Sequence, residues 1–219
     1  IKMITKVLPN KTSTIYAYYP EANSGKDAIM EMTYGGSTLT DPSRMLLYFS
    51  NSKINDKTAS LGITNADFQL YIYSAQTEQA TDEIEIELRT LSRSWDEGYG
   101  EINFSPQLTE SVSWNMRKTN VSWSNAGGDY WTGSYSQSIT LTTKADSGDD
   151  LSFNVNSIVN PWLSGSIDNN GFLVKFVTES NPSNPVSLKY FSAHTSTIYQ
   201  PSLLIKWNDF NYNSGSLTT

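Results

Sequence analysis

Residues 83–89 read Glu-Ile-Glu-Ile-Glu-Leu-Arg, the most regular alternation of charged and apolar side chains in the chain. Successive side chains of a β-strand point to opposite faces of the sheet, so this period of two predicts a strand. Its two isoleucines and its leucine should lie in a hydrophobic core. Its glutamates and arginine should face water, where an exposed row of like charges discourages pairing with the edge of another sheet.

Similar short runs cover most of the chain and are separated by turn residues. Residues 67–73 alternate in the same way, whereas residues 44–49 are almost continuously apolar, as expected of a central strand buried on both faces. Helical spacing is confined to a short helix near residues 158–162 and to one helical turn or long loop within residues 51–65. The sequence predicts an all-β, antiparallel β-sandwich of jelly-roll type with one short helix. We expect a single domain over residues 1–219, with a C-terminal tail at residues 209–219.

The composition excludes several classes of protein. The 219 residues carry a net charge of −7, which disfavours nucleic-acid binding because phosphate contacts need a concentrated positive field. No run approaches the roughly 18 apolar residues that a membrane span needs. The absence of cysteine excludes disulfides, thiolate catalysis and cysteine-based zinc sites. Because 12% of the residues are aromatic, we expect large rings to supply much of the core.

Residues suited to catalysis are sparse. His194 is the only histidine, so a catalytic triad would depend on this one base, and we interpret it as a polar turn residue. Asp96 and Glu97 are the best candidates for a pair of catalytic carboxylates. Adjacent residues of one strand point to opposite faces, so these two side chains should not flank one bond. We therefore predict that the protein is not an enzyme.

Two loops carry carboxylates with the oxygen chemistry that calcium prefers. One is Gly127-Gly128-Asp129 and the other, residues 144–150, contains Asp149. The second lacks the glutamate and the alternation of a calcium-binding loop, and a glycine turn with a carboxylate that caps backbone amides would explain the first. We expect no cofactor, with structural calcium at Asp129 or Asp149 as the open alternative.

Aromatic residues gather in residues 94–131, which hold four of the six tryptophans. Exposed tryptophan and tyrosine rings are platforms for sugars and for protein partners. The candidate ligand-binding residues are Tyr99, Trp114, Tyr130 and Trp131. The alternative is that Trp95, Trp114 and Trp123 close the ends of the sandwich.

Several short motifs follow one another in a characteristic order. They are Ser-Arg-Met-Leu-Leu-Tyr-Phe at 43–49, the alternating run at 66–73, Trp-x-Glu-Gly at 95–98, Val-Ser-Trp to Gly-Gly-Asp-Tyr at 112–130, the run at 155–176, and the closing run at 191–205. This order resembles the DNRLRE domain, a β-sandwich family also counted as family 96 of the carbohydrate-binding modules. The resemblance covers roughly residues 14–207. The chain departs from the family pattern at Asn160-Pro161, which should interrupt the short helix, and at Gln200, where the family often has arginine.

The resemblance implies binding or assembly rather than catalysis. Members of that family occur as modules of secreted polysaccharide-active or cell-wall proteins and as stand-alone proteins of phage virions. We expect a structural component of a bacteriophage virion, in a neck, tail, baseplate or head-fibre position, that contacts other virion proteins in multiple copies. The alternative is a secreted module that binds a polysaccharide through Tyr99, Tyr130 and Trp131. Neither nucleic acid nor a membrane is an expected partner.

Overall fold

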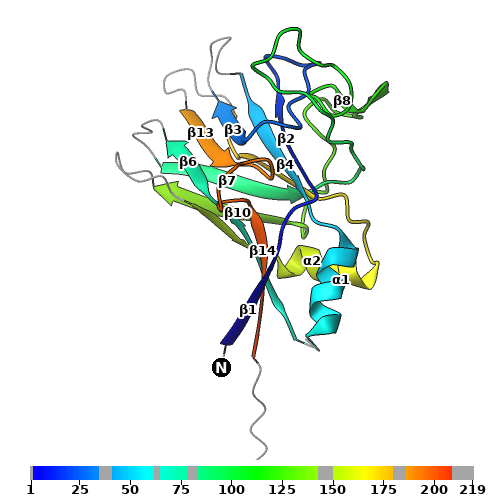
Figure 1. Ribbon diagram of the computed structural model, residues 1–219, viewed down its shortest axis with the longest axis vertical. Helices are drawn as coiled ribbons and strands as arrows, with labels where there is room; N and C mark the ends of the chain where they lie inside the picture. Colours follow the sequence, from blue (N-terminus) through cyan, green and yellow to red (C-terminus); the bar gives the residue numbers. More distant parts are fainter. Residues whose placement is uncertain are drawn as a thin grey trace, which may run out of the picture.

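The computed structural model describes residues 2–34, 41–61, 65–77, 83–142, 150–179 and 186–208. Over these residues the protein is an antiparallel β-sandwich accompanied by two short helices (Figure 1). The predicted all-β sandwich is therefore confirmed, with one more helix than expected. Neither helix of the described residues is long and apolar enough to cross a bilayer.

One layer of the sandwich is a five-stranded sheet and the other consists of a four-stranded and a three-stranded sheet. The five-stranded sheet has the order β10 (Ser136–Thr142), β7 (Glu83–Thr90), β12 (Phe172–Phe176), β4 (Ser43–Tyr48) and β2 (Lys11–Tyr16). The four-stranded sheet has the order β1 (Lys2–Val7), β14 (Ser202–Asn208), β5 (Asp67–Ile72) and β11 (Leu151–Asn154). The three-stranded sheet has the order β3 (Ile29–Tyr34), β13 (Val186–Phe191) and β6 (Ser74–Thr77).

Only one pair among the described strands joins consecutive strands, the small hairpin of β8 (Met116–Lys118) and β9 (Val121–Ser122). Every other hydrogen-bonded pair joins strands with at least one other strand between them in the sequence. This interleaving is expected of a jelly roll. As a consequence, segments far apart in the sequence, such as β1 and β14, lie side by side (Figure 1).

The principal core fills the space between the two layers. The predicted alternation of β7 is realised there, because Ile84, Ile86 and Leu88 are all buried. The inward residues of β5 and β12 meet them from both layers, and each fully buried aliphatic or aromatic side chain of this kind stabilises the fold by about 1.5–3 kcal/mol. Trp162 and Phe172 pack with their ring centroids 4.6 Å apart.

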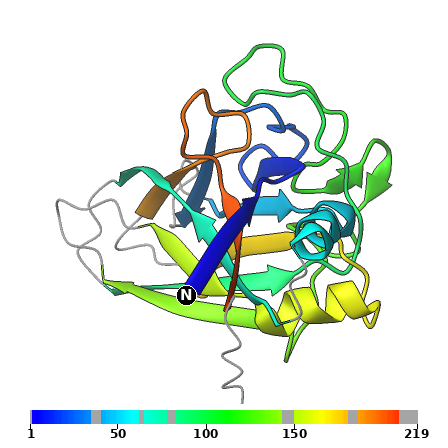
Figure 2. The same ribbon diagram turned by 60° about the horizontal axis from the view of Figure 1, so that its bottom comes forward.

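Two helices, α1 (Asn51–Ser60) and α2 (Asn156–Ser164), lie beside each other at one end of the sandwich (Figure 2). The side chain of Ser50 caps α1 by accepting a hydrogen bond from the Lys53 amide. The expectation that Pro161 interrupts the second helix is wrong. The helix continues through Pro161 and ends at Gly165, whose left-handed backbone (φ 75°) suits glycine. Burial of the apolar face of α2 compensates for the missing proline amide.

The outer face of the five-stranded sheet is covered by residues 91–135, which we call the covering segment. A second hydrophobic cluster forms between them, from three residues of the sheet and four of the segment. Its members are Ile15, Leu46 and Leu173 from the sheet and Leu91, Trp95, Val112 and Trp123 from the covering segment. The interpretation of Trp95 and Trp123 as plugs at the ends of the sandwich is thus corrected, because both pack on a sheet face. The prediction that residues 44–49 are buried on both faces is confirmed for Met45, Leu46 and Leu47.

The charged face of β7 is more buried than the sequence predicts. Glu87 was expected in water, yet it is only 8% exposed and pairs with Arg89 at 2.6 Å and with Lys175 at 3.1 Å. β7 lies between β10 and β12 and is not an edge strand, so the expected role of its glutamates in discouraging edge-to-edge pairing does not apply. Glu85 alone among the described side chains of this row is exposed as expected.

Candidate functional site

A buried asparagine organises the turn that follows Trp95. The Asn23 side chain donates to the carbonyls of Glu97 (2.8 Å) and Val112 (2.7 Å). Its Oδ1 accepts from the amides of Gly100 (2.7 Å) and Gly25 (3.2 Å). These four bonds use the amide's two donors and both acceptor positions of its oxygen. The Asn23 side chain thus replaces the ladder of backbone bonds that an irregular segment lacks.

The two glycines of this turn are required by the close approach of the chain to Asn23. Gly98 has a φ of +80°, and a Cβ there would lie 2.4 Å from the Asn23 Oδ1. A Cβ on Gly100 would lie 2.3 Å from the Asn23 carbonyl oxygen. Only glycine fits both positions without moving the asparagine.

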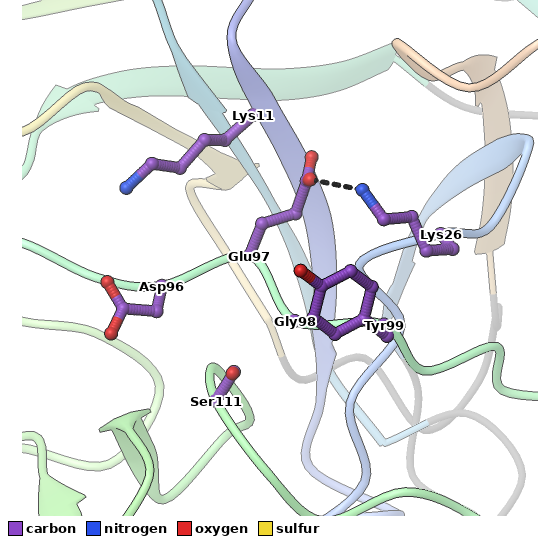
Figure 3. Close-up of a pocket in the computed structure, with 7 residues that line it drawn as sticks. All are labelled: Lys11, Lys26, Asp96, Glu97, Gly98, Tyr99 and Ser111. Atoms are coloured by element: carbon purple, nitrogen blue, oxygen red, sulfur yellow. Dashed lines mark hydrogen bonds and ion pairs between the residues drawn. The ribbon is translucent and has the colours of Figure 1, made fainter.

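Glu97 joins three segments that are distant in the sequence. Its Oε1 accepts hydrogen bonds from the Thr12 amide of β2 (2.8 Å) and from the His194 Nε2 (2.9 Å). Its Oε2 accepts from the Lys26 Nζ at 2.7 Å (Figure 3). The expected polar turn residue, His194, therefore also fixes its own loop to the covering segment.

A pocket of about 300 Å³ lies beside this turn (Figure 3). Its lining consists of Lys11, Lys26, Asp96, Glu97, Gly98, Tyr99 and Ser111. Tyr99 is 82% exposed, and the Lys26 Nζ lies 5.5 Å from the centroid of its ring. The pocket thus combines one exposed aromatic ring with two ammonium groups, two carboxylates and a hydroxyl.

Lys11 is held differently from Lys26. Its Nζ donates to the Trp95 carbonyl at 2.7 Å and lies 5.2 Å from the Tyr48 ring centroid and 5.4 Å from that of Trp95. Its ammonium forms no ion pair with a described carboxylate, although Asp96 lies close enough to influence it. Burial lowers the pKa of Lys11, and the charge of Asp96 partly opposes this.

The carboxylates of Asp96 and Glu97, which are adjacent in the sequence, do not face the same part of the pocket. Asp96 is turned towards solvent and pairs with Lys118 at 3.4 Å, while the Glu97 carboxylate points to the opposite side of the pocket (Figure 3). The reason given from the sequence does not apply, because these residues lie in an irregular turn and not on a strand, yet the two side chains do diverge.

The four candidate aromatic residues do not share one surface feature. Tyr99 is the only one that lines this pocket. Trp114 and Tyr130 are half-buried against the second cluster, with the guanidinium groups of Arg44 and Arg89 over their rings at 4.8 and 5.7 Å respectively.

Trp131 stands apart from them. It is 42% exposed and packs edge to face on Tyr135 at 6.3 Å. Of the two exposed candidates, Tyr99 is the one that lines the pocket described above, together with charged groups.

A chain of charges lies between the covering segment and the sheet. Arg44 donates from Nε and Nη2 to the Glu179 carboxylate at 2.7 and 2.6 Å, and from Nη1 to the Gly127 carbonyl at 2.6 Å. Lys175 lies 3.5 Å from Glu179 and links this pair to Glu87. Because Gly127 belongs to the covering segment, Arg44 ties the cover to β4.

The calcium candidate Asp129 caps a turn. Its Oδ2 accepts from the Ser124 amide and its Oδ1 from the Asn125 amide, both at 2.8 Å. Burial raises the pKa of Asp129, but the hydrogen bonds from Ser124 and Asn125 outweigh it, so the pKa is lowered. Asp149 lies outside the described residues. Within the described ranges no group of three or more His, Cys, Asp or Glu side chains is placed to hold a metal ion.

Sequence reasoning missed Asn23, Lys11 and Lys26 as residues of the site. The signal available was the pair of glycine turns, Asn-Ser-Gly-Lys at 23–26 and Glu-Gly-Tyr-Gly at 97–100. Glycine marks places where backbone approaches another segment closely, and here the two turns approach each other.

Together these features define a class: an antiparallel β-sandwich module with an irregular segment over one sheet and a small charged pocket in that segment. A family model described as the disaggregatase related repeat domain matches residues 35–205. The chain belongs to this disaggregatase related repeat domain family. No curated protein matches the chain. The family match does not test the resemblance to the DNRLRE domain, which stays a prediction.

Proposed function

We propose that the domain is a non-catalytic binding module that holds a saccharide in the pocket beside Tyr99. One observation carries the proposal: a tyrosine ring that is 82% exposed stands at the edge of a pocket with two ammonium groups. The C–H face of a sugar ring packs on an aromatic ring, and ammonium groups donate to hydroxyl or carboxylate oxygens. Apolar contact with a few fixed polar groups is the usual design of a small ligand site.

The state of the two carboxylates supports a site without catalysis. General acid or base chemistry needs a carboxylate within reach of the reacting bond. Glu97 already accepts hydrogen bonds from Thr12, Lys26 and His194, and Asp96 faces away from it. Neither is arranged as one half of a pair around a glycosidic bond.

The rigidity of the turn also favours binding. Asn23 and Glu97 hold residues 97–100 through side-chain hydrogen bonds, so little ordering is left for the ligand to impose. A site that is ordered in advance loses less conformational entropy on binding.

The test is a titration of the purified domain with a panel of neutral and acidic oligosaccharides, followed by calorimetry on two variants. Tyr99→Ala should weaken the affinity about tenfold, the effect of one aromatic contact, without changing the melting temperature. Trp131→Ala removes another exposed ring and serves as the matched control, which should bind as the wild type does. The proposal fails if no saccharide binds, or if both variants lose affinity equally.

The second candidate is the structural role in a phage virion, acting through protein contacts. The observation that favours it is β1, whose outer side pairs with no described strand and which exposes Met3 and Ile4. An exposed apolar edge strand is a template for pairing with another chain.

Sedimentation of the domain over a range of concentrations tests this second role. Assembly is expected, and Ile4→Lys should abolish it. Persistence of the monomer at every concentration would speak against it.

A further inference from the structure

A second pocket, of about 460 Å³, lies on the outer face of the three-stranded sheet and shares no lining residue with the Tyr99 pocket. It is bounded by the end of β2, the start of β3, the middle of β13 and a loop of the covering segment. The residues that line it are Tyr16, Asp27, Ala28, Ile29, Glu31, Ile102, Asn103 and Lys189.

The charges around this pocket are unbalanced. Asp27 and Glu31 line it, Glu101 lies close enough to act on Asp27, and Lys189 is the one cation in the lining. Among the described residues, the Asp27 carboxylate accepts only a long hydrogen bond from the Ile102 amide, at 3.2 and 3.3 Å from its two oxygens. Burial raises the pKa of Asp27 to about 6; the Ile102 amide opposes this, and the charges of Glu101 and Glu31 add to it. A cation beside Asp27 would relieve this repulsion.

A row of four aromatic rings begins at the rim of the pocket. Phe191 follows Lys189 on the same face of β13 and lies opposite Ile29, which lines the pocket. Its ring stacks on Tyr199 at 5.7 Å. The row continues through Tyr73, 5.4 Å from Tyr199, to Tyr71, 4.9 Å further on. We call Phe191, Tyr199, Tyr73 and Tyr71 the aromatic row.

We propose that this pocket and the aromatic row form one docking surface for a segment of a partner protein. The segment places a lysine or arginine side chain beside Asp27 and an aromatic or aliphatic side chain on Phe191 and Tyr199. Charge complementarity selects this occupant, because the pocket has more carboxylates than ammonium groups. At this acidic pocket a second copy of the chain is a poorer occupant than a basic partner segment, since each copy carries a net charge of −7.

The spacing between the pocket and the aromatic row fits an extended peptide. Ile29, which lies opposite Phe191, is two residues from Asp27, and alternate residues of an extended chain lie on one face at a similar spacing. A partner with a basic residue and an aromatic residue at positions i and i+2 would therefore reach the pocket and the row together.

The experiment uses two acetylated and amidated pentapeptides, Gly-Lys-Gly-Trp-Gly and the same peptide with norleucine in place of lysine. Each is titrated into the isotopically labelled domain and followed by the amide chemical shifts of the domain. The lysine peptide should bind with millimolar affinity, shift Asp27, Lys189 and Phe191, and bind about tenfold more tightly than the norleucine peptide, as expected for one charge-assisted hydrogen bond.

Variants separate the two halves of the surface. Asp27→Asn keeps the shape of the side chain and should remove the difference between the two peptides. Asp96→Asn makes the same charge change at the Tyr99 pocket and should preserve it. Tyr199→Ser should weaken both peptides by the same factor, because it removes the aromatic contact only.

Several outcomes would overturn the inference. They are equal affinity of the wild type for the two peptides, a preference for lysine that survives Asp27→Asn, shifts confined to other surfaces, or no binding of either peptide. Tyr99→Ala should leave peptide binding intact, so failure of the saccharide proposal and failure of this one are distinguishable.

Discussion

The principal core and the second cluster under the covering segment differ in how their backbone groups are satisfied. In the principal core, strands such as β7 and β12 bond to each other along their length, and side chains only have to pack. In the covering segment the backbone bonds are scattered and irregular, and polar side chains add to them: Asn23 and Asp129 bond to backbone groups of the segment, and Glu97 bonds to the Thr12 amide of β2. The loss of one polar side chain should therefore matter more in the cover than anywhere in the sheets.

Among substitutions of polar residues, the largest effect should come from Asn23→Ala. The substitution leaves two carbonyls and two amides without their partner, and we expect a loss of about 4 kcal/mol in the free energy of unfolding. Urea denaturation measures it. Asn55→Ala, on the exposed face of α1, is the control and should change the stability by no more than about 0.5 kcal/mol.

Truncation of a core side chain tests whether the covering segment depends on its polar side chains more than the sheets do. Leu88→Ala should cost about 2–5 kcal/mol through lost burial and a cavity. If Asn23→Ala cost less than about 1 kcal/mol while Leu88→Ala cost several, the cover would not depend on its polar side chains.

The next largest effect concerns the charges between the cover and the sheet. Arg44→Met leaves the Glu179 carboxylate with Lys175 as its remaining cation among the described residues and frees the Gly127 carbonyl, so we expect a loss of about 2–3 kcal/mol. A double-mutant cycle with Glu179→Gln, measured by urea denaturation, should give a coupling energy of about 1–2 kcal/mol. Additive losses would mean that the pair contributes nothing beyond packing.

The sequence predicted the principal core well because its signal is local. The alternation in residues 84–88 and 68–72 states which side chains face inward, and all six apolar ones are buried. The partners of each strand could not be read in this way, since nearly all pairs join strands that are not consecutive.

The same reasoning failed on the outer face of the five-stranded sheet, because burial there depends on contacts between segments that are distant in the sequence. Glu87 looks solvated on its own strand, and only the pairing of β7 with β12 places it beside Lys175. Tyr99 is exposed at a pocket, whereas Trp114 and Tyr130 are half-buried, and residue type alone did not distinguish the three. Which ring is covered depends on contacts from distant segments, such as the one that Arg44 makes with Trp114.

A smaller effect is expected from pH at the second pocket. The pKa of Asp27 in the folded protein, about 6, exceeds its ordinary value of 3.8, so the folded state binds this proton more tightly than the unfolded state. The stability that the protonated group contributes is fully present below about pH 4 and is lost as the pH rises to 6. Because Asp27 is partly solvated, we expect the loss to be on the order of 1 kcal/mol.

Urea denaturation at several pH values between 4 and 7 checks this. Asp27→Asn should abolish the decline. Asp129, whose pKa is lowered, has the opposite dependence: its contribution is present above its ordinary pKa and is lost as the pH falls through the lower value of the folded state. An unchanged decline in Asp27→Asn would assign it to another group.

The smallest change in stability is expected for Tyr99→Ala, whose ring is proposed to bind a ligand and not to hold the turn together. Trp95 is buried, donates from its indole to the Asn170 carbonyl and belongs to the second cluster, whereas Tyr99, four residues later, is 82% exposed. Thermal and urea denaturation of Tyr99→Ala should therefore show a change within about 0.5 kcal/mol, while Trp95→Ala should lose about 3–5 kcal/mol. A loss above about 1 kcal/mol in Tyr99→Ala would make the ring part of what holds the turn together. Its exposure would then no longer favour a ligand, and the saccharide proposal would lose the observation that carries it.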